Sequence, residues 1–135
     1  MLDPAALKRA SALLDQRVGL DALWVFGSEA AGTATSASDL DLAALFRRRL
    51  SPSEFLALRA ELASVLGRDV DLVDLERASP VLVMQVLRHG ALVADRNPER
   101  RLRFTATAPG RYEDLVLVRR TAERRLLERV RGGRP

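Results

Sequence analysis

The chain of 135 residues contains no cysteine, which excludes disulfide frameworks, zinc–thiolate sites and cysteine nucleophiles. It has a single histidine and only 4% aromatic residues, so a histidine-based metal site has no second imidazole to use. No stretch approaches the ~18 consecutive apolar residues of a membrane span, and the N-terminus lacks the basic and apolar regions of a secretory signal. These absences predict a cytoplasmic protein that does not enter a membrane.

The remaining composition is ordinary for a soluble globular domain, with 47% hydrophobic and 30% charged residues. A length of 135 residues lies at the most common size for one domain and is long enough to bury a real core. The sequence therefore predicts a single domain over residues 1–135, with a C-terminal helical segment over 98–131.

The net charge of +4 is unevenly distributed. Residues 97–135 hold 11 basic and five acidic side chains, whereas residues 1–96 hold 11 basic and 13 acidic ones. A basic tail is typical of nucleic-acid binding, and a steep salt dependence of affinity would support that hypothesis. Base stacking needs aromatic platforms, however, and this segment offers only Phe104 and Tyr112. Nucleic acid is therefore not the expected main partner.

Hydrophobic periodicity predicts helices alternating with strands. Helices are expected at 4–17, 52–66, 80–87 and from 98 onward, the first three beginning at Asp-Pro or Ser-Pro pairs that suit helix starts. Strands are expected at 20–26, 39–46, 69–75 and 91–94. Because proline loses its amide donor and clashes with the preceding turn, Pro109-Gly110 is expected to kink or break the last helix. The alternation indicates an α/β or α+β domain.

Three features of the helical regions have ordinary structural interpretations. An apolar stripe at helical spacing in the C-terminal segment is expected to be core rather than interface, and three arginines before it are expected on a solvated face. The lone histidine lies at a helix end, where it complements the helix dipole. The stripe is Leu115, Val118, Ala122 and Leu126, the arginines are Arg100, Arg101 and Arg103, and the histidine is His89.

The most informative pattern is Gly27-Ser28 followed, after ten residues, by Asp39-Leu40-Asp41. A strand that ends in a glycine turn can present backbone amides and a serine hydroxyl to phosphate oxygens. Asp39 and Asp41 share one face of a strand, where two like charges repel unless a cation neutralises them. Mg²⁺ favours such hard oxygen ligands. Either half alone is more often an ordinary turn or a charged strand end.

A third carboxylate completes this pattern in the strand expected at 69–75. If this strand neighbours the previous one, Asp71 can join Asp39 and Asp41. It would then serve as a general base or as a further ligand of the ion. Asp74 is predicted to lie on the opposite face and is the weaker candidate.

These motifs, together with Val70-Asp71-Leu72-Val73, resemble the nucleotidyltransferase superfamily related to DNA polymerase β, and more closely its minimal nucleotidyltransferases. The resemblance implies a nucleotidyltransferase fold with a mixed β-sheet flanked by helices. It implies that Gly27 and Ser28 hold the nucleotide triphosphate, and that Asp39, Asp41 and Asp71 form the catalytic Mg²⁺ site. It also implies transfer of a nucleoside monophosphate, usually AMP from ATP, to a hydroxyl, with an all-helical HEPN toxin as partner in a homo- or hetero-oligomer.

One departure from the family pattern bears on activity. The family often has Ala-Arg-Gly after Gly-Ser, whereas this chain has Ala30-Ala31-Gly32. Ala31 removes a candidate phosphate or partner contact without touching the carboxylates. Two hypotheses therefore remain open: an antitoxin enzyme that transfers AMP to its toxin, and a catalytically weak module that neutralises a toxin by docking alone.

Overall fold

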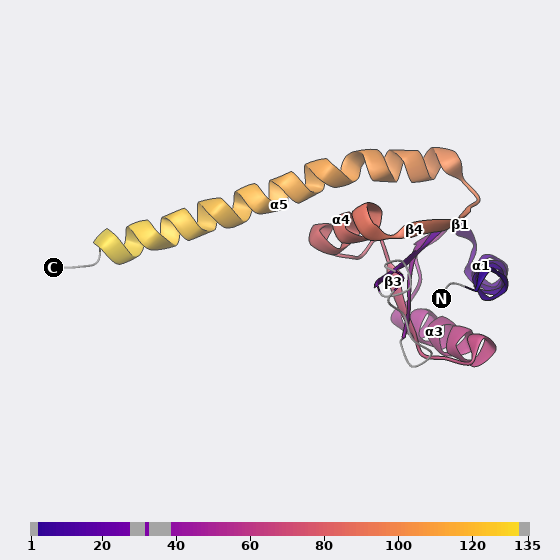
Figure 1. Cartoon of the computed structure of the whole chain (residues 1–135). Coiled ribbons are helices and arrows are strands. Elements are labelled where there is room, and N and C mark those ends of the chain that lie inside the picture. The colour runs from indigo at the N-terminus through magenta and orange to yellow at the C-terminus, as the bar shows by residue number, and fades with distance from the viewer. Residues whose placement is uncertain (1–2, 28–31, 33–38, 133–135) are drawn as a thin grey trace.

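The computed structural model describes residues 3–27, 32 and 39–132 (Figure 1). The predicted alternation of helices and strands is confirmed, with boundaries that differ by one or two residues. The elements are α1 (Pro4–Val18), β1 (Leu20–Phe26), β2 (Leu40–Phe46), α3 (Pro52–Leu66), β3 (Val70–Asp74), α4 (Pro80–His89), β4 (Ala91–Asp95) and α5 (Pro98–Gly132). None of these helices has a stretch long and apolar enough to cross a bilayer.

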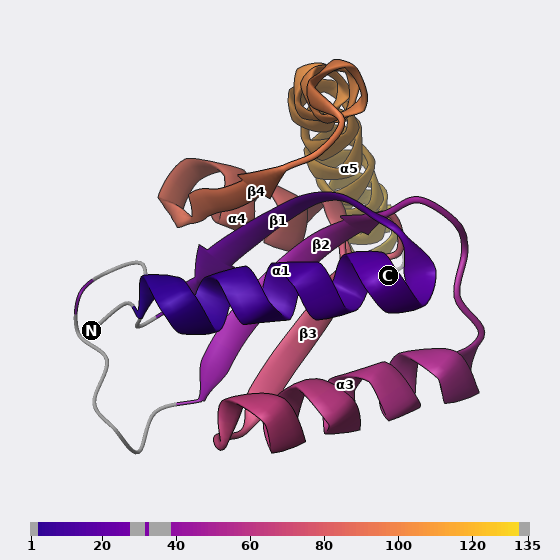
Figure 2. The ribbon, with the colours of Figure 1, turned by 90° about the vertical axis from the view of Figure 1, so that its right-hand side faces the viewer.

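The four strands form one mixed sheet in the order β3-β2-β1-β4. β1 pairs antiparallel with both β2 and β4, whereas β2 and β3 are parallel. Helices α1 and α3 cover one face of this sheet, and α4 with the first part of α5 covers the other (Figure 2). The predicted fold class, a mixed sheet flanked by helices, is confirmed.

Side chains of the central strands alternate between two hydrophobic cores. Leu23 and Val25 of β1 pack toward α1 and α3, while Ala22 and Trp24 pack toward α4 and α5. β2 divides its residues in the same way, and all but one are buried. A strand that is covered on both faces reads as a nearly continuous apolar run. The exception in β2 is Asp41, which is therefore conspicuous in this strand.

Local capping explains why three helices begin where the sequence predicts. The side chains of Asp3, Ser51 and Ser79 accept hydrogen bonds from backbone amides of the first turn, and each is followed by proline. Ser51 also forms a reciprocal capping box with Glu54. These interactions satisfy amide donors that have no partner within the helix. They fix the helices that flank the sheet.

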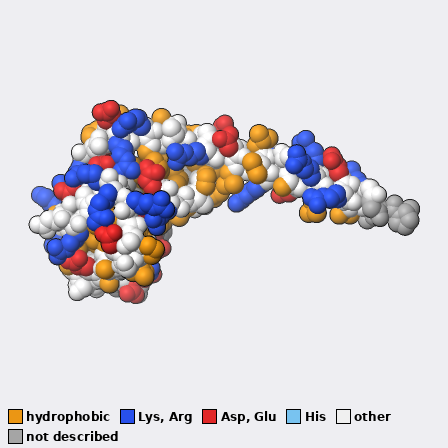
Figure 3. All heavy atoms as spheres, turned by 180° about the vertical axis from the view of Figure 1, so that it is seen from behind, with side chains coloured by type: hydrophobic (Ala, Val, Ile, Leu, Met, Phe, Trp, Pro, Cys, Tyr) orange, Lys and Arg blue, Asp and Glu red, His pale blue; other side chains and the backbone are white. Residues whose placement is uncertain are grey.

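Of the kink or break predicted at Pro109, the structure excludes the break: the helix is continuous through this residue, and Figure 1 shows that it bends along its length. A second prediction about α5 is wrong. The stripe expected in the core is instead largely exposed, with Val118 65% and Leu126 58% accessible. The reason is visible in Figure 3: the second half of α5 projects beyond the body of the protein, so nothing in the described chain covers it.

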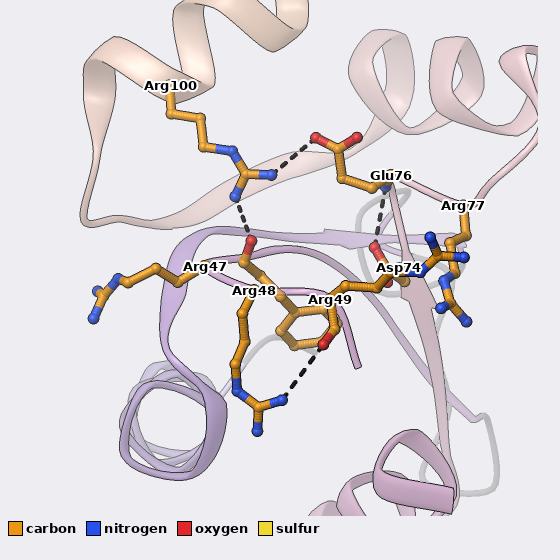
Figure 4. Close-up of a pocket in the computed structure, with 8 residues that line it drawn as sticks. Arg47, Arg48, Arg49, Asp74, Glu76, Arg77 and Arg100 are labelled. Carbon is orange, nitrogen blue, oxygen red and sulfur yellow. Dashed lines mark hydrogen bonds and ion pairs between the residues drawn. The ribbon is translucent and has the colours of Figure 1, made fainter. Parts of the chain in front are cut away.

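The first turn of α5 is fastened to the body by Arg100, which is not on a solvated face as predicted. Its guanidinium donates to the carboxylate of Asp21 at 2.8 Å. It also donates to the carboxylate of Glu76 at 2.8 Å and to the backbone carbonyl of Phe46 (Figure 4). Asp21 is only 4% exposed. Arg101 likewise pairs with Asp95 at 2.8 Å. The network explains how α5 is held in a fixed direction.

We expect Arg100→Ala to destabilise the fold by about 3 kcal/mol, because it removes the closest cation from a buried carboxylate. Arg47 remains, but its Nε lies 3.6 Å from Asp21. The matched control is Arg48→Ala, which removes exposed contacts with Glu54 and with the carbonyl of Arg49 and should change stability little. Thermal unfolding should show a midpoint lowered by about 10 °C for the first variant. Equal losses in both variants would contradict the assignment.

Candidate functional site

The predicted carboxylates gather at one edge of the sheet, where β2 and β3 begin and β1 ends. Asp41 lies directly opposite Asp71 in the parallel β2–β3 register, and opposite Phe26 in the antiparallel β1–β2 register. Residues opposite each other in a ladder point to the same face, so both carboxylates face the α4 side of the sheet. Asp39, just before β2, is exposed. The expectation that the strand of Asp71 lies next to the strand of Asp41 is thus confirmed.

The charges of this cluster act on Asp41 most strongly. Its pKa is raised above the ordinary value, first by burial and then by the negative charges of Asp71 and Asp39, while Arg68 partly opposes the rise. A half-buried carboxylate that repels two neighbours is unfavourable in the absence of a counter-charge. The cluster therefore has the electrostatics of a cation site.

Gly27, at the end of β1, lies directly against the carboxylate of Asp41. Its φ of +67° is a conformation that residues with a Cβ rarely adopt, and an added Cβ would lie 2.2 Å from Oδ2 of Asp41. The glycine therefore serves two needs, the turn at the end of β1 and the space for the carboxylate. Ser28, the second predicted nucleotide-binding residue, and Ala31 lie outside the described residues.

The donor set fits Mg²⁺ in its chemistry, since it consists of carboxylate oxygens on neighbouring strands. Among the residues that the structure describes, no three such side chains are already gathered into a metal-binding set. Asp39, Asp41 and Asp71 are the residues that would hold it.

Sequence reasoning missed two arginines that shape this edge. Arg68 stands two residues before β3 and attracts Asp41 electrostatically. The Nε of Arg59 on α3 donates to the carbonyl of Val70 at 2.9 Å, which fixes the start of β3 beside β2. The sequence does hold a signal for Arg68, because this basic residue stands just before the strand that contains Asp71. The role of Arg59 depends on a contact that spacing does not reveal.

Two pockets differ in their relation to the carboxylates. One of about 430 Å³ lies beside Asp39, between α3 and the start of β3, and includes Arg59 and Asp69. The other, of about 390 Å³, contains five arginines and lies where β2 and β3 end (Figure 4). The second is at the opposite end of these strands from Asp41. The pocket beside Asp39 adjoins the candidate site through Asp39, because α3 covers the face of the sheet opposite to the one that Asp41 and Asp71 share.

Comparison with known proteins agrees with this geometry. Residues 8–99 match the family described as Polymerase beta, Nucleotidyltransferase. The protein adenylyltransferase MntA of Shewanella oneidensis is 42% identical over 78 residues. That alignment covers 58% of this chain and 56% of MntA, so the chain matches little more than half the length of this relative.

Two solved structures extend the similarity to nearly the whole chain. A toxin–antitoxin crystal structure with AMP-PNP has a TM-score of 0.78 and 31% identity, covering 93% of this chain and 99% of that one. The structure of a tri-AMPylated Shewanella oneidensis HEPN toxin in complex with an MNT antitoxin has a TM-score of 0.74 and 27% identity. This match covers 91% of this chain and 97% of that one. The predicted resemblance to the minimal nucleotidyltransferases is confirmed, and the chain belongs to the polymerase β nucleotidyltransferase family.

Proposed function

We propose that this protein is an antitoxin enzyme that transfers AMP from ATP, with Mg²⁺, to a hydroxyl group of a HEPN-type toxin. The observation that carries the proposal is the pairing of Asp41 with Asp71 across β2 and β3, with Gly27 against Asp41. MntA is named a protein adenylyltransferase, and a HEPN toxin bound to a matching antitoxin is AMPylated. Both relatives support AMP transfer as the reaction.

The proposed reaction is an in-line displacement at the α-phosphorus of ATP. A bond forms between the acceptor oxygen and this phosphorus, the bond to the β-phosphate oxygen breaks, and pyrophosphate leaves. Asp71, which is exposed, would accept the proton of the acceptor hydroxyl. Asp39 and Asp41 would hold the ion with it. Bound there, Mg²⁺ supplies Lewis-acid stabilisation of the charge on the transferred group.

The test is label transfer to a HEPN-type toxin that is purified after co-expression with this chain. We expect label from ATP marked at the α-phosphate and none from ATP marked at the γ-phosphate, because only AMP is transferred. The double variant Asp39→Ala/Asp41→Ala should transfer no label. Removing Mg²⁺ with a chelator should have the same effect as the double variant.

The docking hypothesis predicts a different result in the same experiment. If wild type and the double variant bind the partner equally and neither transfers label, the catalytic proposal is wrong. The protein would then neutralise its toxin by binding alone. Label that persists in the double variant would show that the carboxylates are not the transfer site.

A further inference from the structure

The outer half of α5 carries large apolar side chains that have no place in either core. Phe104 and Ala108 are the buried residues of this helix. Further along, five large apolar residues are between 51% and 65% exposed: Leu117, Val118, Leu126, Leu127 and Val130. Figure 1 shows that the outer half of α5 is an arm that leaves the body, and Figure 3 shows hydrophobic and basic side chains along this arm.

The exposed residues continue the face that the inner half of α5 buries. Phe104, Ala108, Leu115, Val118, Ala122, Leu126 and Val130 follow one another at three-, four- or seven-residue intervals. This spacing places them on one side of a helix. The side that packs against the sheet through Phe104 is therefore the side that faces solvent beyond Leu115. We call Leu115, Val118, Ala122, Leu126 and Val130 the α5 face.

The arm is held in a fixed direction by its inner half. Arg100 and Arg101 pair with carboxylates of the body, and Phe104 lies in the core. Arg88 of α4 lies 5.7 Å above the ring of Tyr112. From 115 to 132 the helix extends roughly 27 Å, at 1.5 Å per residue. A surface fixed in this way loses little freedom when a partner binds.

The charge on the arm restricts what can cover it. Between Arg119 and Arg131 there are six arginines and two glutamates. A second copy of this chain would bring the same excess of positive charge to the interface. A partner with an apolar surface and an acidic rim would instead be attracted. The α5 face therefore fits a heterologous partner better than self-association.

The comparisons separate this arm from the family's domain. The match to the polymerase β nucleotidyltransferase family ends at residue 99, where α5 has just begun. The match to the toxin–antitoxin structure with AMP-PNP covers 93% of this chain. The unmatched part is much shorter than the 35 residues of α5, so most of α5 lies within the match. The helix is thus shared with a chain solved with its toxin, although it lies outside the family match.

We propose that the α5 face is the docking surface for the HEPN-type partner, and that its contact on that partner is a helical apolar surface with an acidic rim. This inference rests on the proposed function for the identity of the partner. Docking and AMP transfer then depend on different parts of the protein. The α5 face binds the toxin, and the site of Asp39, Asp41 and Asp71 transfers AMP to it.

The test compares two variants of α5 in the full-length protein. Val118→Asp/Leu126→Asp alters exposed residues of the α5 face and is expected to fold normally. It should raise the Kd for the HEPN-type partner at least 100-fold, as loss of central apolar anchors does. The control is Leu102→Asp, on the same helix, 56% exposed and outside the α5 face. Its Kd should match that of wild type. Calorimetric titration measures both values.

Three further readouts separate the possible outcomes. Binding of Mg²⁺-ATP should be the same in wild type and the double variant, so that weaker partner binding is not a defect of the nucleotide site. If Val118→Asp/Leu126→Asp binds the partner as tightly as wild type does, the docking inference is wrong. Label transfer by wild type would still support the proposed function in that case. If wild type is a dimer that the double variant dissociates, the α5 face serves self-association, and the inference is wrong.

Discussion

Replacing Asp41 with asparagine is expected to lower the rate of AMP transfer at least about 10³-fold, the scale of losing several kcal/mol of charge stabilisation. The same change should stabilise the metal-free protein. Asp41 is directly opposite Asp71, and the repulsion of two like charges at such positions costs about 0.2–1 kcal/mol. The substitution therefore moves activity and stability in opposite directions, which a merely structural residue would not do.

The measurements are kcat/KM for label transfer and the unfolding midpoint with and without Mg²⁺. In wild type, Mg²⁺ should raise the midpoint, since it binds the folded state. In Asp41→Asn the metal-free midpoint should be about 1–4 °C higher and should respond less to Mg²⁺. Asp74→Asn, on the same sheet but at the opposite end of β3, is the control and should keep both activity and Mg²⁺ response. If the Asp41→Asn protein were fully active, the assignment of Asp41 to the site would be wrong.

The raised pKa of Asp41 gives this prediction a pH dependence. Burial and the charges of Asp71 and Asp39 raise this pKa in the folded state, so the folded protein binds the proton more tightly than the unfolded chain. The contribution of Asp41 to stability therefore falls as pH rises from the ordinary aspartate pKa through the raised one. Without metal, Asp41→Asn should lose less stability than wild type over this window.

Local rules of sequence were enough to predict the elements of the fold. A capping residue followed by proline marks the start of α1, α3 and α4 at Asp3, Ser51 and Ser79, because the signal and the structure involve the same few residues. The carboxylate edge could also be predicted, since strand alternation places Asp39 with Asp41 and one pairing of strands adds Asp71. The helix starts and the pair Asp39 and Asp41 needed only short-range geometry, whereas Asp71 also needed the pairing of β2 with β3.

The predictions that proved wrong depend on contacts distant in the sequence. Arg100 pairs with Asp21, 79 residues away, and nothing near either residue reveals this. The apolar spacing of Leu115 to Leu126 indicates an amphipathic helix, but it does not say whether the body of the same protein reaches that far.

Replacing Gly27 with alanine is expected to lower AMP transfer about 100-fold, the scale of a 1 Å displacement of a catalytic group. An added Cβ would meet Oδ2 of Asp41 at 2.2 Å, so the carboxylate must move from its position beside Asp71. The positive φ of +67° adds a backbone penalty of about 1–2 kcal/mol for a residue with a Cβ. Activity and stability should therefore both fall.

Gly67→Ala provides a matched control, because it separates the two effects. Gly67 has nearly the same φ, +66°, but no atom lies within 4 Å of the position of its added Cβ. It ends α3, and no carboxylate lies within 4 Å of the added Cβ. Both variants should therefore lose similar stability in chemical denaturation, whereas only Gly27→Ala should lose transfer activity. If the two variants lost activity equally, the effect would follow from lower stability, and the close approach of Gly27 to Asp41 would have no catalytic role.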